Sequence, residues 1–136
     1  RLIGLDLGSK RIGVSICDEK QLIATPLKTI NRSTLNQLIS DLKAIIDENN
    51  IKGIIIGNPI NMDGSSGRSA QSVKDTSQKI EEKIKIPICL WDERLSTVGA
   101  FNLSSQLDIN VSKREKKIDE NAAAFILQGA IDFLNN

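Results

Sequence analysis

Three short segments at the start of the chain have the apolar patterns of β-strands. Residues 2–7 are almost continuously apolar and predict a strand buried on both faces, although Asp6 lies within it. A turn separates this segment from residues 11–17, so the two predict a hairpin. A third strand is expected over residues 22–30. It should lie at a sheet edge, because Pro26 cannot donate a ladder hydrogen bond.

The remaining chain alternates helical and strand-like spacing. Thr34 and Gln37 match a capping box at the start of the first helix. The predicted helices cover residues 33–50, 70–84, 95–107 and 119–134, and the predicted strands cover 53–57 and 88–91. The polar and basic residues 108–117 predict a loop. A meander followed by alternating helices and strands predicts an α/β fold, with helices packed on a mixed sheet.

Length and composition restrict the possible functions. The chain has 136 residues, which suits one domain over residues 1–136. A net charge of +1 requires any nucleic acid to bind a local basic patch, and 3% aromatic residues argue against a large base-stacking platform. Cys17 and Cys89 each lie in an apolar run and are interpreted as buried, reduced thiols. With no signal peptide and no apolar run of roughly 20 residues, we expect a cytoplasmic protein.

Asp6 is the first candidate functional residue. Burying an unpaired carboxylate in an apolar strand costs several kcal/mol, so a partner is expected. One interpretation is a structural pair with a base such as Arg11. The other is a metal ligand, because a bound cation offsets the cost of desolvation.

Two further carboxylates occupy similar positions. Asp92 and Glu93 follow the predicted strand 88–91, and ligand sites in α/β sheets lie beyond strand carboxyl ends. Alternation directs these two side chains to opposite faces, so at most one should point into a given site. Asp119 is expected to open the last helix, where it could be only an N-cap. With no histidine in the chain, the acids would suit oxygen-ligated Mg²⁺ or Mn²⁺.

Four motifs along the chain, in order, resemble the YqgF/RuvX family, whose fold is RNase H-like. They lie at residues 4–14, 57–68, 91–97 and 119–129, so the resemblance covers essentially the whole chain. It implies a five-stranded mixed sheet with the first three strands antiparallel, two parallel strands and helices on both faces. It also implies a metal-dependent nuclease whose catalytic and metal-binding acids are Asp6, Glu93 and Asp119.

Members of this family are described as nucleases that finish the 5′ end of 16S ribosomal RNA and as resolvases of four-way DNA junctions. We favour the ribosomal RNA role and keep the resolvase role as the alternative. Two further alternatives are a non-catalytic nucleic-acid-binding module and one half of a sugar-kinase or actin-like ATPase. The basic residues near the acids form the candidate phosphate-contacting patch: Lys10, Arg11, Arg94, Lys113, Arg114, Lys116 and Lys117.

Overall fold

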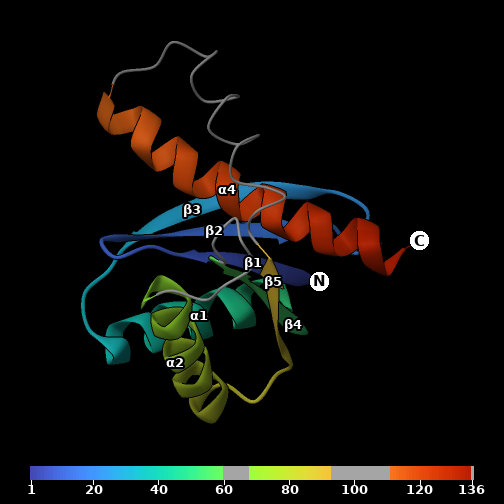
Figure 1. Ribbon diagram of the computed structural model, residues 1–136. Helices are drawn as coiled ribbons and strands as arrows, with labels where there is room; N and C mark the ends of the chain where they lie inside the picture. The colour runs from blue at the N-terminus through green and yellow to red at the C-terminus, as the bar shows by residue number, and fades with distance from the viewer. Residues whose placement is uncertain (60–67, 93–110, 136) are drawn as a thin grey trace.

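A computed structural model describes residues 1–59, 68–92 and 111–135 of the chain, with side chains throughout except at 68–69 and 111–120. In the described part, five strands form one sheet (Figure 1). Strands β1 and β2 form the expected hairpin, β3 pairs with β2, and β4 and β5 follow β1 in parallel. Their bounds are β1 Leu2–Leu7, β2 Arg11–Cys17, β3 Ala24–Asn31, β4 Gly53–Asn58 and β5 Ile88–Asp92. This is the predicted mixed sheet, in the order β3-β2-β1-β4-β5.

Helices cover both faces of the sheet. α1 (Leu35–Asn49) and α2 (Arg68–Lys83) lie on one face, and α4 (Val111–Leu134) lies on the other (Figure 1). Each face has its own apolar cluster. The α1 and α2 side includes Ile3, Leu5 and Leu42, and the α4 side includes Ile55 and Leu127. β1 is therefore buried from both sides, as its continuous apolar pattern predicts.

The start of α1 follows the sequence prediction in part. Thr34 is the N-cap, and its hydroxyl oxygen accepts a hydrogen bond of 3.1 Å from the backbone N–H of Gln37. The Gln37 side chain donates instead to Asp41 at 3.0 Å, so the Thr34 half of the capping box is confirmed and the Gln37 side chain is used elsewhere. Pro26 lies in β3, an edge strand, as expected.

The predicted loop over residues 108–117 is wrong from Val111 onward, because α4 begins there. Lysine, arginine and glutamate are good helix formers, so a polar segment need not be a loop. Asp119 consequently lies in the third turn of α4 rather than at its start, and the N-cap interpretation is also wrong. The predicted helix over 95–107 lies outside the described residues.

The two cysteines differ in environment. Cys17 is buried beneath α4, as expected, whereas Cys89 is exposed. Cys89 lies on β5, an edge strand, and α4 packs mainly on β1, β2 and β3. The prediction of burial at Cys89 is wrong because an apolar run does not reveal which strand is left uncovered. No helix in the described part of the chain is long and apolar enough to span a membrane.

Candidate active site

The carboxyl ends of the parallel strands bring Asp6 level with residues of two other strands. β1 pairs with β4 through Leu5 and Ile56, and β4 pairs with β5 through Gly57 and Trp91. One residue further along β1, Asp6 therefore lies at the level of Gly57 and Trp91. Ligand sites in α/β sheets form beyond this edge.

Asp6 faces the α4 side of the sheet. A Cβ atom added to Gly4 would lie 2.8 Å from the carbonyl oxygen of Ala123 and 2.8 Å from Cβ of Leu127, both in α4. Side chains two residues apart on a strand share a face, so Asp6 points to the same side as Gly4. The side chain of Asp6 is half-buried there, beside Gly13 of β2.

Successive side chains of β5 point to opposite faces of the sheet, which determines the face that Asp92 occupies. Leu90 packs into the cluster beneath α1 and α2, whereas Trp91 packs into the cluster beneath α4. Asp92 continues the Leu90 face, away from Asp6. Glu93 and Arg94 lie outside the described residues, so their positions stay predictions. A strand extended by one residue would place Glu93 on the face of Asp6.

The direction of α4 determines where Asp119 lies along the sheet. Ala123 lies over Gly4, and further along the helix Gln128 bonds to the backbone N–H of Ala24 at 2.8 Å. Ala24 pairs with Cys17, at the amino end of β1, so α4 runs antiparallel to β1 (Figure 1). Asp119 precedes Ala123 by about one helical turn, or roughly 6 Å. Asp6 follows Gly4 by roughly 6.6 Å along β1. Because α4 is antiparallel to β1, the backbone of Asp119 and that of Asp6 are displaced from the Ala123–Gly4 contact in the same direction along the sheet.

The described side chains contain no group of three or more acidic or cysteine residues that could hold a metal ion. The predicted trio is not tested by this result, because the side chains of Glu93 and Asp119 are not described. Arg11 lies two residues from Gly13 on the same face of β2, diagonal to Asp6. The structural pair between Asp6 and Arg11 therefore remains geometrically available.

The predicted basic patch is described in part. Lys10 is exposed at the hairpin turn, and Arg11 is half-buried at the start of β2. The four basic residues of the patch that belong to α4 fall in its first two turns: Lys113, Arg114, Lys116 and Lys117. Arg94 lies outside the described residues. Because α4 is antiparallel to β1, its first turns and the hairpin belong to the same end of the sheet (Figure 1).

Arg32 is a residue near this edge that the sequence did not reveal. Its guanidinium donates to the carbonyl oxygen of Gly8 at 2.9 Å and to the hydroxyl of Thr76 in α2 at 3.3 Å. Its backbone N–H donates to the carbonyl oxygen of Lys10 at 2.9 Å. Arg32 thus fastens the β1–β2 turn, two residues beyond Asp6, to α2. Its only signal in the sequence is a basic residue at a strand-to-helix junction.

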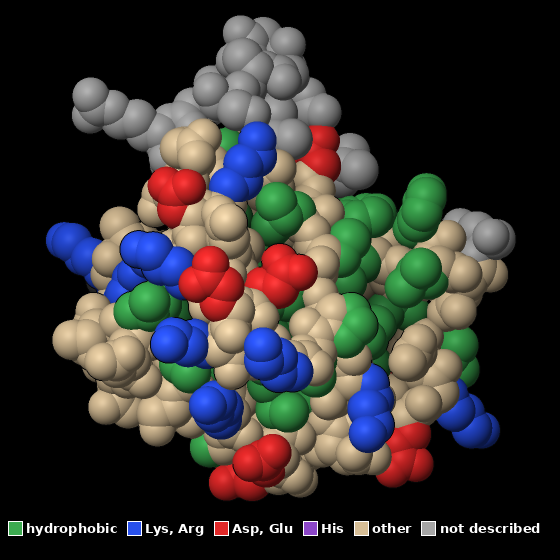
Figure 2. All heavy atoms as spheres, turned by 90° about the horizontal axis from the view of Figure 1, so that it is seen from below, with side chains coloured by type: hydrophobic (Ala, Val, Ile, Leu, Met, Phe, Trp, Pro, Cys, Tyr) green, Lys and Arg blue, Asp and Glu red, His purple; other side chains and the backbone are tan. Residues whose placement is uncertain are grey.

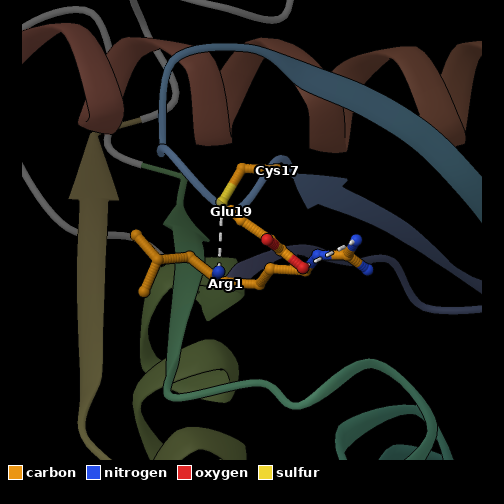
Figure 3. A network of polar contacts seen from close by, with 4 residues as sticks. Arg1, Cys17 and Glu19 are labelled. Carbon is orange, nitrogen blue, oxygen red and sulfur yellow. Dashed lines mark hydrogen bonds and ion pairs between the residues drawn. The ribbon is translucent and has the colours of Figure 1, made fainter.

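A cavity of about 560 Å³ lies away from Asp6 and is lined by Arg1, Glu19, Glu48, Asn49 and Asn50. Figure 3 shows part of this region, where Arg1 and Glu19 form an ion pair at 3.9 Å. Beside it, the backbone N–H of Leu2 contacts the sulfur of Cys17 at 3.1 Å. An exposed ion pair contributes little to stability, and this end of β1 is opposite to the strand carboxyl ends. We therefore do not assign the active site to this cavity.

Comparison with known proteins identifies the family. A family model described as "RuvX: Holliday junction resolvase" matches residues 1–133. The chain belongs to the RuvX family. A RuvX relative from Pelagibacter ubique, named "Putative pre-16S rRNA nuclease", is 74% identical over 136 residues, which is 100% of this chain and 90% of the relative. A relative of the same name from Rhodobacter capsulatus is 45% identical over 98% of this chain and 84% of its own length.

Solved structures agree with the fold predicted for a RuvX chain. T. thermophilus RuvC in complex with Holliday junction substrate has a TM-score of 0.59 at 10% identity, over 99% of this chain and 95% of that one. The Fowlpox virus resolvase with Holliday junction DNA has a TM-score of 0.56 at 8% identity, over 99% of both chains. At such identities the similarity concerns the fold alone, which is RNase H-like as the sequence motifs imply.

Proposed function

We propose that this RuvX chain is a metal-dependent nuclease that hydrolyses phosphodiester bonds in the maturation of the 5′ end of pre-16S ribosomal RNA. The observation that carries the proposal is the position of Asp6, a half-buried carboxylate at the carboxyl edge of β1, beneath α4. Relatives named for pre-16S rRNA, at 74% and 45% identity, support the choice of substrate. A nuclease of precursor ribosomal RNA acts where ribosomes are assembled, so the proposal includes a cytoplasmic location.

The proposed catalytic residues are Asp6, Glu93 and Asp119. Asp6 provides the central carboxylate. If β5 continued by one residue, Glu93 would fall on the Trp91 face, and Asp119 precedes Ala123 by about one turn of α4, so both residues would lie on the Asp6 side of the sheet. Two strands and a helix would then contribute to one site from positions far apart in the sequence.

The same residues are the proposed ligands of Mg²⁺ or Mn²⁺. The donor set is made of carboxylate oxygens in a chain without histidine, which suits these hard cations better than zinc. When bound, such an ion activates a water molecule and offsets the charge on the phosphodiester. Asp6 would be held in place for this role because β1 is central in the sheet and packed on both faces.

Basic residues around the acids are the proposed contacts to the phosphate backbone. Lys10 and Arg11 lie on the hairpin, and the α4 residues belong to the same end of the sheet. Such contacts position a nucleic acid without reading its sequence. Few aromatic residues are available for stacking, which supports binding mainly through the backbone.

A second candidate function is resolution of four-way DNA junctions. The description of the matching family model, which names a Holliday junction resolvase, favours it. The chemistry at the carboxylates would be the same for either substrate. A non-catalytic nucleic-acid-binding module is the third possibility, and the carboxylate at Asp6 argues against it.

A parallel cleavage assay discriminates these functions. The full chain is incubated with Mg²⁺ or Mn²⁺ and either pre-16S RNA or a four-way DNA junction. We expect metal-dependent cleavage of the RNA near its mature 5′ end and little cleavage of the junction. Cleavage of the junction alone would establish the alternative function. Binding of either substrate without any cleavage would favour the non-catalytic module.

A further inference from the structure

A second concave site lies at the same end of the sheet, on the face opposite α4. Its volume is about 150 Å³, and it lies where β3 leads into α1. Two side chains from α2 complete it. The lining residues are Arg32, Ser33, Thr34, Leu35, Leu38, Thr76 and Lys79.

The chemistry of this cavity suits an anion. It combines a guanidinium from Arg32 and an ammonium from Lys79 with three hydroxyl groups. Within the described part of the chain, no ion pair is found between either cation and a carboxylate. The guanidinium uses two of its five N–H groups for Gly8 and Thr76 and keeps further donors for a ligand. Arginine and lysine with hydroxyl groups are the usual protein contacts to phosphate.

Helix α1 adds to this preference. Thr34 caps the helix by accepting from the N–H of Gln37, and Leu35 is its first helical residue. The free N–H groups and the partial positive charge of a helix start favour a bound anion. The two cations lie beside this helix start, so three sources of positive potential act on one cavity.

The cavity is connected to the candidate active site through one side chain. The Arg32 guanidinium, which lines the cavity, donates to the carbonyl oxygen of Gly8, and the N–H of Gly8 donates to the carbonyl oxygen of Asp6 at 3.1 Å. In a double helix, each strand carries one negative charge per roughly 3.4 Å of helix axis. A strand that passes Asp6 therefore has other phosphates within reach of the opposite face of the sheet.

We propose that this cavity binds a backbone phosphate of the nucleic acid outside the cleavage position, so that the substrate wraps around the carboxyl edge of the sheet. Figure 2 shows the face of α1 and α2, where Lys and Arg side chains are interspersed with acidic ones. The basic and hydroxyl groups that line the cavity, rather than a broad basic surface, account for the binding. This inference rests on the proposed nuclease function for its ligand, a phosphodiester.

The test compares Lys79→Ala with Lys74→Ala, two exposed lysines of α2 of which only Lys79 lines the cavity. Each change is made in the full chain carrying Asp6→Asn, which silences cleavage, and binding of a labelled single-stranded RNA is measured over a salt series. Loss of one phosphate contact should lower the salt slope by about 0.7 and weaken binding about eightfold at roughly 0.05 M salt. Lys74→Ala should retain the parent slope. Equal behaviour of the two variants would overturn the proposal.

Arg32→Lys provides a second variant that keeps the charge but not the fork of donors. It should bind RNA more weakly than the parent, and its unfolding temperature should fall only modestly, because the ammonium can keep one of the two bonds to Gly8 and Thr76. Inorganic phosphate serves as the small-ion probe. If phosphate raises the melting temperature of the parent but Lys79→Ala leaves RNA binding unchanged, the cavity takes free phosphate only and the proposal is wrong. These binding measurements do not depend on cleavage, so failure of the nuclease proposal and failure of the phosphate site are distinguishable.

Discussion

The hydroxyl of Ser15 on β2 donates a hydrogen bond of 2.7 Å to the carbonyl oxygen of Ala123 in α4. Ser15 is fully buried, and the bond joins residues 108 positions apart in the chain. It fixes the position of α4 along the sheet about one helical turn after Asp119. A small polar residue in an apolar strand thus has a structural role that can be measured.

Replacing Ser15 by Ala should destabilise the protein by about 1–2 kcal/mol, because a buried donor is lost and the Ala123 carbonyl loses a partner. Denaturant unfolding measures the change. Thr25→Ala is the control, since the exposed Thr25 hydroxyl makes a longer bond of 3.4 Å to Ile16. The control should change stability by less than about 0.5 kcal/mol. Equal losses for both variants would contradict the role given to Ser15.

Gly4→Ala tests the close approach of α4 to β1. The new methyl group would lie 2.5 Å from the Ser15 hydroxyl and 2.8 Å from the Ala123 carbonyl oxygen, so the helix must move. We expect a loss of about 1–3 kcal/mol in stability. Cleavage should fall by about a hundredfold at a temperature where the variant is folded, since Asp119 is displaced.

Gly129→Ala is the matched control on α4. Its methyl group would lie 3.1 Å from Nε1 of Trp91, a tight contact rather than a clash with backbone. Alanine in a helix gains about 0.5–1 kcal/mol over glycine, which offsets the crowding. The stability should therefore change by less than about 1 kcal/mol. A loss as large as that of Gly4→Ala would show that the α4 contact is not specific to Gly4.

Asp18 makes stability depend on pH in the acid range. The backbone N–H groups of Ile23 and Leu22 donate to its carboxylate and hold its pKa below the ordinary value of 3.8. The stabilisation is fully present above 3.8 and is lost as the pH falls through the lowered pKa of the folded state. Thermal unfolding of the parent and Asp18→Asn should therefore differ at neutral pH and converge in acid. A difference that grows on acidification would reverse the assigned sign.

The sequence predicts much of the sheet because its signals are local. The apolar run around Asp6, the turn before Arg11 and the proline in β3 determine strands, a hairpin and an edge without reference to distant residues. The cap at Thr34 is local in the same way. A local signal also makes Asp6 a candidate site residue, because a carboxylate in a buried strand is costly wherever the rest of the chain lies.

The remaining features depend on contacts that sequence spacing does not reveal. Arg32 bonds residues 24 and 44 positions away, and the exposure of Cys89 depends on which strands α4 covers. The sequence predicts a loop at the helical start of α4 because polarity alone does not distinguish a loop from an exposed helix. The joint role of Asp6, Glu93 and Asp119 and the single domain over residues 1–136 stay predictions.

Binding through α4 is tested by replacing Lys116 and Lys117 with Ala. The loss of two phosphate contacts should weaken binding similarly across nucleic-acid sequences and reduce the salt slope by about 1.4 for a single strand. Lys43 and Lys52, which are exposed on and after α1, form the control pair with the same change in charge. An unchanged slope for the α4 pair, or an equal change for the control pair, would refute the patch.

Asp6→Asn is the most direct test of the whole account. The change keeps the size of the side chain and removes its charge, so cleavage of pre-16S RNA with Mg²⁺ or Mn²⁺ should fall by orders of magnitude. Without metal, the melting temperature should stay the same or rise, because one of several repelling charges is gone. RNA binding through the basic patch should be retained. A variant that folds and cleaves normally would contradict the account, and a variant that fails to fold would favour the structural pair of Asp6 with Arg11.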